Sequence, residues 1–242
     1  MDAIEIQGLT KQYKDVTAVD GLNLSIRQGE LFSLLGVNGA GKTTTIKMLS
    51  CLIQPTKGDA LLMGHSICKA PATVKSLIAV SPQETAIAPG LSVQENLELI
   101  CGVHGFSKAK KIAKITELTQ LLGLESVIRK KAGKLSGGWQ RRLSIAMALI
   151  SEPQILFLDE PTLGLDVLAR RDLWDLIRSL KGRITIILTT HYMEEAEALS
   201  DRIGIMKNGH LLHSGTAQEI KDTAGTDNCE QAFIQIVREE TV

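Results

Sequence analysis

The octapeptide GVNGAGKT, Gly36 to Thr43, constrains the fold of this chain more than any other segment. It matches the phosphate-loop pattern G-x-x-x-x-G-K-[ST], and it lies between an apolar run, Leu31 to Leu35, and the helical pattern TTTIKMLSCLI. Glycines let backbone amides turn toward phosphates, Lys42 places a charge on the β and γ phosphates, and the Thr43 hydroxyl can ligate Mg²⁺. The sequence therefore predicts a strand–loop–helix unit that binds a nucleotide. The expected contacts are Gly36, Asn38, Gly39, Gly41, Lys42, Thr43 and Thr44.

A second motif, ILFLDEP, places two carboxylates where an apolar run ends. Next to a phosphate loop, Asp159 is positioned to bind Mg²⁺ through water, as a partner of the Thr43 side of the site. Glu160 is then the candidate general base for an attacking water. The two motifs together predict a nucleotide site that carries out hydrolysis.

The apolar patterns predict an α/β fold with a mostly parallel sheet. Three runs do not alternate with polar residues, as in strands that are buried on both faces: Leu77–Val80, Ile155–Leu158 and Ile184–Leu188. In contrast, Ile4–Ile6 and Leu22–Ile26 alternate like half-exposed antiparallel strands. We therefore expect a P-loop NTPase core with an N-terminal antiparallel β-subdomain.

Helical signals replace strand signals between residues 84 and 150, which predicts an inserted α-helical subdomain. Ser92 and Glu95 form a capping-box pattern, and a second helix starts after Ser107 and stops near Gly123. Beyond the insertion, Asn208-Gly209 predicts a hairpin turn. We expect one domain over 1–242, divided into a RecA-like core (1–83 and 151–215), the helical subdomain (84–150) and a short helical tail (216–242).

Composition limits the partners. Lys+Arg and Asp+Glu are equal at 27 each, so no basic excess points to nucleic acid, and we expect no nucleic-acid partner. The four cysteines show no C-x-x-C or metal spacing and predict free structural thiols in a reducing compartment. The chain shows no signal-peptide pattern and no apolar run of roughly 18 residues, which predicts a cytoplasmic protein.

The stretch KLSGGWQRRLSIAMALI predicts a helix with an unusual start. Its apolar face is formed by Trp139, Leu143, Ala146, Met147 and Ile150, and Arg141 and Arg142 lie off that face. Ser136-Gly137-Gly138 precedes the helix where its free amides are presented, an arrangement that suits an anion.

With both nucleotide motifs and Leu135-Ser136-Gly137-Gly138, the chain resembles the ATP-binding subunit of an ABC transporter from about Ile4 to His213. The resemblance implies that two nucleotide domains close head to tail over two ATP molecules. Ser136 and the amides near Gly137 and Gly138 would then bind the γ-phosphate of ATP held by the second subunit. Trp139 stands where the family more often has Gln or another polar or flexible residue.

The resemblance implies four further site residues. Gln83 corresponds to the Q-loop glutamine that reaches Mg²⁺ or the attacking water, and His191 to the switch histidine that contacts the γ-phosphate. Tyr13 takes the place of the aromatic residue that stacks on adenine. Asp166 ends the D-loop segment TLGLD, in which Leu163 departs from the small or polar residue often seen.

The resemblance also implies the partners. ATP hydrolysis would drive an integral membrane permease that docks near Gln83 to Leu99, so that the chain is peripheral on the inner face of the cell membrane. The second ATPase subunit would be a copy of this chain or a relative. The segment LTKQYKDVTAVDGLNLSI looks most like prokaryotic exporters of drugs, antibiotics or polymers. The alternative is an ABC ATPase with a soluble partner, such as an iron–sulfur assembly complex. A GTPase is disfavoured because N-K-x-D is missing.

Overall fold

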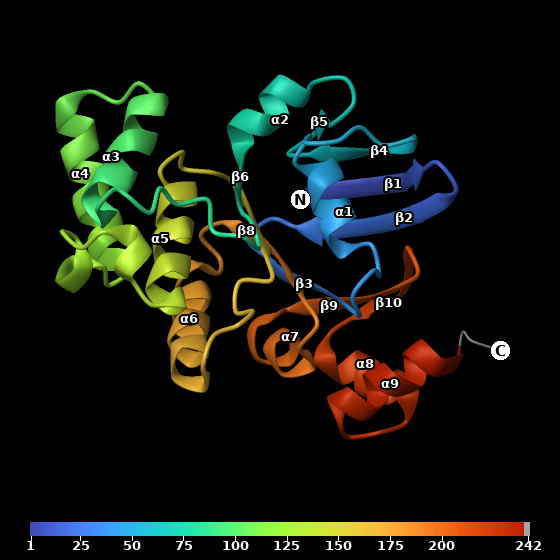
Figure 1. The fold of residues 1–242 in the computed structure, drawn as a ribbon. Helices are drawn as coiled ribbons and strands as arrows, with labels where there is room; N and C mark the ends of the chain where they lie inside the picture. The colour runs from blue at the N-terminus through green and yellow to red at the C-terminus, as the bar shows by residue number, and fades with distance from the viewer. Residues whose placement is uncertain (240–242) are drawn as a thin grey trace.

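The computed structural model describes residues 1–239 and contains two sheets with helices packed around them (Figure 1). The smaller sheet has the strand order β2-β1-β4-β5, and the larger has the order β10-β9-β3-β8-β7-β6. The predicted α/β class is therefore correct.

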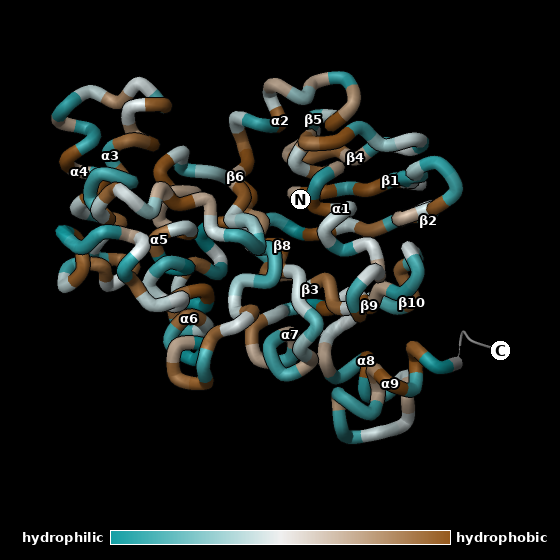
Figure 2. Tube along the Cα trace, viewed as in Figure 1, coloured by the Kyte–Doolittle hydropathy of each residue, from teal (hydrophilic) through white to brown (hydrophobic). Residues whose placement is uncertain are grey.

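The smaller sheet is antiparallel and is formed mainly by the N-terminal segment. Its strands are β1 (Asp2–Tyr13), β2 (Val16–Arg27), β4 (Lys57–Leu62) and β5 (His65–Ser66). Ile4, Ile6 and Leu9 of β1 are buried, in keeping with one covered face. In Figure 2, the turn that joins β1 to β2 is hydrophilic.

The larger sheet is mostly parallel. Its strands are β3 (Leu31–Gly36), β6 (Ile78–Ser81), β7 (Ile155–Asp159), β8 (Thr185–Thr190), β9 (Arg202–Lys207) and β10 (His210–Gly215). Only β10 runs antiparallel to its neighbour. Every residue of β3, β7 and β8 is buried, which explains why their sequences do not alternate. The carboxyl ends of β3, β6, β7 and β8 consequently share one edge.

Four helices pack around this core: α1 (Lys42–Leu49), α2 (Pro71–Leu77), α6 (Val167–Leu180) and α7 (Met193–Leu199). Ile46, Met48 and Leu49 of α1 belong to a hydrophobic cluster that contains residues of both sheets. The sequence pattern predicted that α1 continues to Ile53. This prediction is wrong, because the helix ends at Leu49. Cys51 has a φ of 56°, so the chain leaves the helix there.

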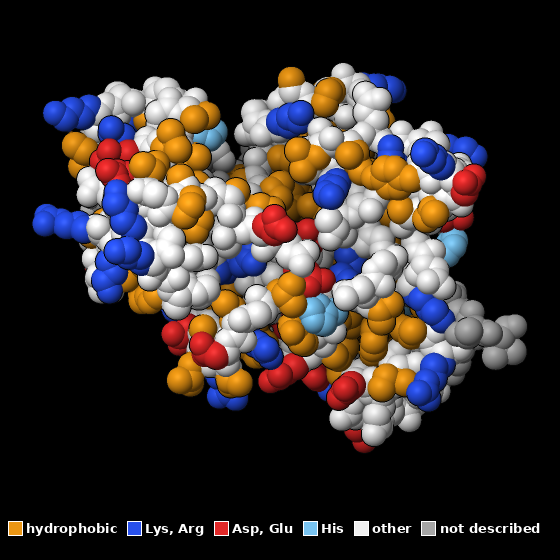
Figure 3. Space-filling model, viewed as in Figure 1, with side chains coloured by type: hydrophobic (Ala, Val, Ile, Leu, Met, Phe, Trp, Pro, Cys, Tyr) orange, Lys and Arg blue, Asp and Glu red, His pale blue; other side chains and the backbone are white. Residues whose placement is uncertain are grey.

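The segment between β6 and β7 is helical and lies to one side of the large sheet (Figure 1). It contains α3 (Val93–Val103), α4 (Lys108–Leu121), two 3₁₀ turns (Glu125–Val127 and Ala132–Lys134) and α5 (Gly137–Leu149). Both predicted N-caps form, because the Ser92 and Ser107 side chains accept hydrogen bonds from helical amides. On the face shown in Figure 3, Lys and Arg side chains gather over this part of the molecule.

The C-terminal part begins with the β9–β10 hairpin, whose turn residues Asn208 and Gly209 both have positive φ. Two helices follow, α8 (Ala217–Ala224) and α9 (Cys229–Glu239), and they pack against α7 and this hairpin. Residues 240–242 of the predicted tail lie outside the described residues. The four cysteines are free, and within residues 1–239 no helix has the length and apolar character needed to cross a membrane.

Candidate functional site

A cavity of about 530 Å³ opens at the carboxyl edge of the large sheet. Segments that follow β3, β6, β7 and β8 meet there, as expected for ligand sites in open α/β sheets. The lining residues are Ala18, Asn38, Gly39, Ala40, Gly41, Lys42, Thr43, Thr44, Gln83, Glu160, Leu163 and His191. The structure thus brings together the loop residues and the predicted residues from three other segments.

The phosphate loop joins β3 to α1 and has a backbone that only glycine accommodates at its end. Gly41 has a φ of 104°, and a Cβ atom there would lie 2.5 Å from the carbonyl oxygen of Ala18. Lys42 begins α1, so the free amides of the first helical turn face the cavity. Its ammonium donates to the carbonyl oxygens of Gly36 (2.6 Å) and Val37 (3.2 Å). The loop therefore places the Lys42 ammonium group next to a helix N-terminus, an arrangement suited to phosphate binding.

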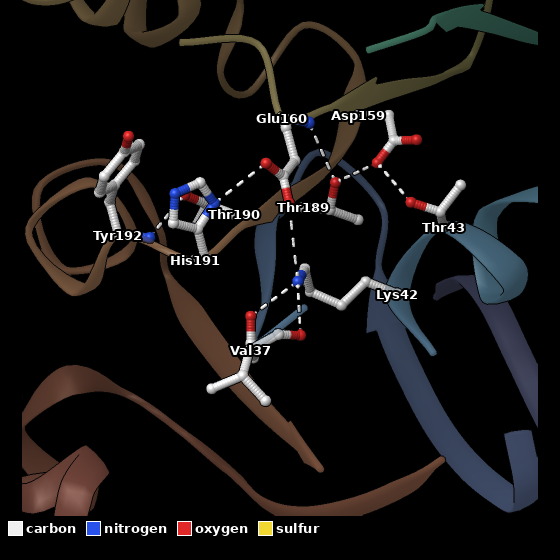
Figure 4. Close-up of polar contacts among 10 residues, drawn as sticks. Val37, Lys42, Thr43, Asp159, Glu160, Thr189, Thr190, His191 and Tyr192 are labelled. Carbon is white, nitrogen blue, oxygen red and sulfur yellow. Dashed lines mark hydrogen bonds and ion pairs between the residues drawn. The ribbon is translucent and has the colours of Figure 1, made fainter. Parts of the chain in front are cut away.

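Asp159 lies at the end of β7 in a network of hydroxyl groups (Figure 4). Its Oδ1 accepts hydrogen bonds from Thr43 Oγ1 at 3.2 Å and from Thr189 Oγ1 at 2.5 Å. Two neighbouring ligands of an octahedral Mg²⁺ are about 3.0 Å apart, given metal–oxygen distances near 2.1 Å. The oxygens of Thr43 and Asp159 are thus close enough to serve one ion, and their chemistry is the kind that Mg²⁺ prefers.

Glu160 follows in a constrained backbone conformation, with a φ of 46° and its amide bound to both the carbonyl and the hydroxyl oxygen of Thr189 (3.1 and 3.0 Å). Its carboxylate lies between two groups in Figure 4. One oxygen is 3.0 Å from His191 Nδ1, and the other is 3.6 Å from Lys42 Nζ. This arrangement fixes a carboxylate at the phosphate end of the cavity, as a general base requires.

The electrostatics of Lys42 reflect its burial, since the residue is only 5% exposed. Desolvation lowers the pKa of the ammonium, and the charges of Glu160 and Asp159 act in the opposite direction. The two carboxylates therefore help to keep Lys42 charged where phosphate would bind.

Other predicted residues lie away from this cavity. Within residues 1–239, its lining does not include Tyr13, Asp166 or the segment Ser136-Gly137-Gly138. Ser136 and Gly137 are exposed at the start of α5. The Asp166 side chain caps α6 by accepting from the Ala169 amide at 2.9 Å. Tyr13 is 45% exposed at the end of β1, with the Lys11 ammonium 5.0 Å from its ring centre.

Two residues that support the site were missed by sequence reasoning, and a third was noted only as a departure in the D-loop segment. The third is Leu163, which lines the cavity. Thr189 connects Asp159 to the Glu160 amide. Arg141 was placed only off the apolar face of its helix, yet it is buried and contacts the backbone of the Gln83 segment. For Thr189, the sequence offered one signal: a threonine near the end of an apolar run, in a chain where another apolar run ends in Asp159 and Glu160.

Trp139, the departure in the signature segment, is partly buried. It packs against the hydrophobic cluster of the helical segment, and the Arg142 guanidinium lies 5.1 Å from its ring centre. Within residues 1–239, no group of three or more His, Cys, Asp or Glu side chains is arranged to hold a metal. The site that Thr43 and Asp159 offer would therefore need additional ligands from the nucleotide and from water.

The model of the ABC transporter family matches residues 19–163. Two curated relatives carry names from drug transport. One is the daunorubicin/doxorubicin resistance ATP-binding protein DrrA of Streptomyces peucetius, 40% identical over 93% of this chain and 68% of that protein. The other is the probable multidrug ABC transporter ATP-binding protein YbhF of Escherichia coli, 39% identical over 98% of this chain and 42% of that protein.

Solved structures agree with this similarity. An ATP-binding subunit of an ABC transporter superposes with a TM-score of 0.85 at 27% identity, over 98% of this chain and all of the other. A dimeric ATP-binding cassette in a post-hydrolysis state, bound to ADP and Pi, superposes with a TM-score of 0.79 at 26% identity, over 88% of this chain and 98% of the other.

Proposed function

The chain belongs to the ABC transporter family and carries its ATPase domain, and we propose that it powers a separate membrane permease, for export. In this proposal, two such domains bind two Mg-ATP molecules in a head-to-tail dimer. The observation that supports ATP hydrolysis is the position of the Glu160 carboxylate, between Lys42 and His191 in the cavity next to the phosphate loop.

Hydrolysis would proceed by attack of water on the γ-phosphorus. Glu160 takes the proton of the water, the bond from the γ-phosphorus to the bridging oxygen breaks, and ADP leaves with that oxygen. Lys42 compensates charge on the β and γ phosphates. His191 holds the Glu160 carboxylate through the 3.0 Å contact and orients the water. Gln83, an exposed residue of the cavity lining, completes the surroundings of the water.

Thr43, Asp159 and Gln83 would hold the magnesium ion, which supplies charge neutralisation for the phosphates when it is bound. The Thr43 hydroxyl would contribute from α1, and Asp159 would act through water. Thr189 holds Asp159 in place by the 2.5 Å hydrogen bond. Tyr13 would stack on adenine, since it lies at the end of β1 and is 45% exposed.

The dimer explains why the signature residues lie outside the cavity of their own chain. Ser136 and the amides of Gly137 and Gly138 begin α5, whose N-terminus would bind the γ-phosphate held by the other subunit. Asp166 and the rest of its loop would lie in the same interface. The structural relative that is dimeric in a post-hydrolysis state, bound to ADP and Pi, supports this arrangement. The second subunit is a copy of this chain or a close relative.

The partner and direction rest on the relatives, two of which are named for drug resistance or multidrug transport. We expect the permease to dock between Gln83 and Leu99. Leu99 and Val103 are 50% and 75% exposed one turn apart on α3, which gives an apolar surface for a helix. This partner would hold the chain at the inner face of the cell membrane. The helical subdomain (84–150) would then transmit closure from the core segments (1–83 and 151–215).

The Glu160→Gln variant tests the catalytic assignment. The amide keeps the shape of the side chain and cannot accept the proton, so we expect kcat to fall about 10²- to 10⁴-fold while ATP binding persists and the dimer is trapped. Glu194→Gln, an exposed residue in the first turn of α7, is the control and should keep wild-type kcat. Rapid turnover by Glu160→Gln would refute the base assignment.

Affinity purification from detergent-solubilised membranes of the native cell tests the partner. A polytopic membrane protein in stoichiometric amount would support the transporter. Recovery with soluble partners only, and no chain in the membrane fraction, would favour the alternative of an ABC ATPase that acts on a soluble complex, such as iron–sulfur assembly.

A further inference from the structure

Arg141 forms an unusual connection between α5 and the segment that carries Gln83. Its guanidinium donates to the carbonyl oxygens of Pro82 at 2.6 Å and of Gln83 at 2.7 Å. Arg141 is only 5% exposed, and both hydrogen bonds are partly buried. A planar guanidinium can bind two successive carbonyl groups at once, whereas a lysine ammonium cannot reproduce this geometry.

A second contact from the same helix holds the preceding residue. Ser144, three positions after Arg141, shares a 2.9 Å hydrogen bond with Ser81 at the end of β6, and both side chains are buried. Residues three apart lie on the same side of a helix. One side of α5 therefore holds the three consecutive residues 81–83 as they enter the nucleotide cavity.

The buried charge of Arg141 is specific to this place in the fold. Burial lowers the pKa of the guanidinium, and the charges of Asp159 and Glu195 offset part of that effect. A charged side chain lies here although burial of an apolar side chain would cost less desolvation free energy. Its hydrogen bonds go to main-chain oxygens, so it fixes the direction of the peptide that precedes the Gln83 side chain.

The two ends of this connection serve different nucleotides in the proposed dimer. Gln83 lines the cavity of its own chain, and Ser136 stands five residues before Arg141, about 7.5 Å along the helix axis. We propose that Arg141 is a positioning residue that makes the placement of Gln83 depend on the placement of α5. Contact between Ser136 and the second nucleotide is thereby coupled to the first site. This inference rests on the proposed head-to-tail dimer.

The test uses the full chain with Glu160→Gln, which should accumulate the ATP-bound dimer. Arg141→Lys is added in one variant, because it keeps the charge and loses the paired hydrogen bonds. Arg142→Lys is the matched control, since Arg142 contacts Leu122 and Asp172 instead of the Gln83 segment. For each variant we would measure the melting temperature, the Kd of a fluorescent ATP analogue for the monomer, and the ATP concentration that gives half-maximal dimer by light scattering.

We expect Arg141→Lys to raise the ATP concentration for half-maximal dimer at least tenfold, with the monomer Kd within twofold of the parent. Arg142→Lys should change both by less than threefold. An equal effect of the two variants on dimer formation, no effect of Arg141→Lys, or a parallel loss of nucleotide binding and dimer would overturn the positioning role. If the parent Glu160→Gln chain itself stays monomeric at saturating ATP, the proposed dimer fails, and this inference fails with it.

Discussion

Thr189 offers the sharpest test of how the site is held together, and Thr189→Val is the informative change. The residue is fully buried on β8, so valine fills nearly the same space and removes only the hydroxyl. That hydroxyl donates to Asp159 at 2.5 Å and accepts from the Glu160 amide at 3.0 Å. The amide keeps its second acceptor, the Thr189 carbonyl oxygen at 3.1 Å, so the main loss is the hydrogen bond to a charged carboxylate.

A hydrogen bond to a charged group contributes about 1.5–3 kcal/mol, and we expect the free energy of unfolding to fall by about that amount. At about 2–4 °C per kcal/mol for a chain of this size, the melting temperature should fall by about 3–12 °C. Because the Asp159 carboxylate and the Glu160 main chain each lose a contact, kcat for ATP hydrolysis should fall about 10- to 100-fold, as for other outer-shell partners of metal-binding groups.

Thr185→Val is the matched control on the same strand. Its hydroxyl accepts from the Gly29 amide at 3.0 Å, at the opposite end of β8 from the cavity. Its removal should cost about 0.5–1.5 kcal/mol, for the lost hydrogen bond to the partly buried Gly29 amide, and leave kcat unchanged. The measurements are urea unfolding followed by tryptophan fluorescence, and kcat at a temperature where both variants are folded. If Thr189→Val keeps kcat within threefold of wild type, or if Thr185→Val loses as much, the positioning argument is refuted.

Three further predictions follow from burial and charge. Burial raises the pKa of Glu195, so its contribution to stability is complete below the unfolded-state pKa near 4.5 and is lost as pH rises through the folded-state value. Urea unfolding should therefore show wild type losing stability relative to Glu195→Gln between pH 4.5 and neutrality, and a pH-independent difference would contradict this. Asp159→Asn should bind ATP about 20-fold more tightly than wild type in EDTA, because two unit negative charges taken to be about 10 Å apart repel each other by about 1.7 kcal/mol at an effective dielectric constant of about 20. The same variant should hydrolyse Mg-ATP more slowly, and weaker binding in EDTA would refute the charge argument. Burial raises the pKa of Cys229 to about 11, whereas Cys68 is exposed, so iodoacetamide at pH 8 should modify Cys68 first, as measured by peptide mass spectrometry.

The sequence allowed the fold class to be predicted because its strongest signals are local. The non-alternating runs of β7 and β8 follow from burial on both faces, and the antiparallel character of β1 and β2 follows from alternation. Glycine and lysine spacing defines the phosphate loop within eight residues. The end of α1 was predicted poorly, since the positive φ at Cys51 leaves no pattern in the residues that precede it.

Residues that support the site through long-range contacts could not be predicted in this way. Arg141 lies 58 and 59 positions from the two carbonyl oxygens it binds, and Thr189 lies 30 positions from Asp159. In the sequence, an arginine on a helix is most simply interpreted as solvated, and a threonine in a buried strand as a filler of space. Only the pairing of β7 with β8 and the packing of α5 near β6 give these residues their partners.

The charges of the cavity explain why closure over ATP would be reversible. Among the described residues that line it, Lys42 is the one lysine or arginine and Glu160 the one acidic side chain, 3.6 Å apart, and Asp159 adds a further negative charge beside them. The N-terminus of α1 contributes only about half a positive charge. Without a divalent cation at Thr43 and Asp159, the site with a bound triphosphate would therefore carry a large net negative charge. In the proposed dimer, the second subunit adds a hydroxyl and amides from Ser136 to Gly138 and brings no formal charge from that segment. The contact between the second subunit and the nucleotide would therefore depend on the γ-phosphate. Hydrolysis and loss of that phosphate would remove these hydrogen bonds, whereas the repulsion among the negative charges of the nucleotide and the cavity would remain.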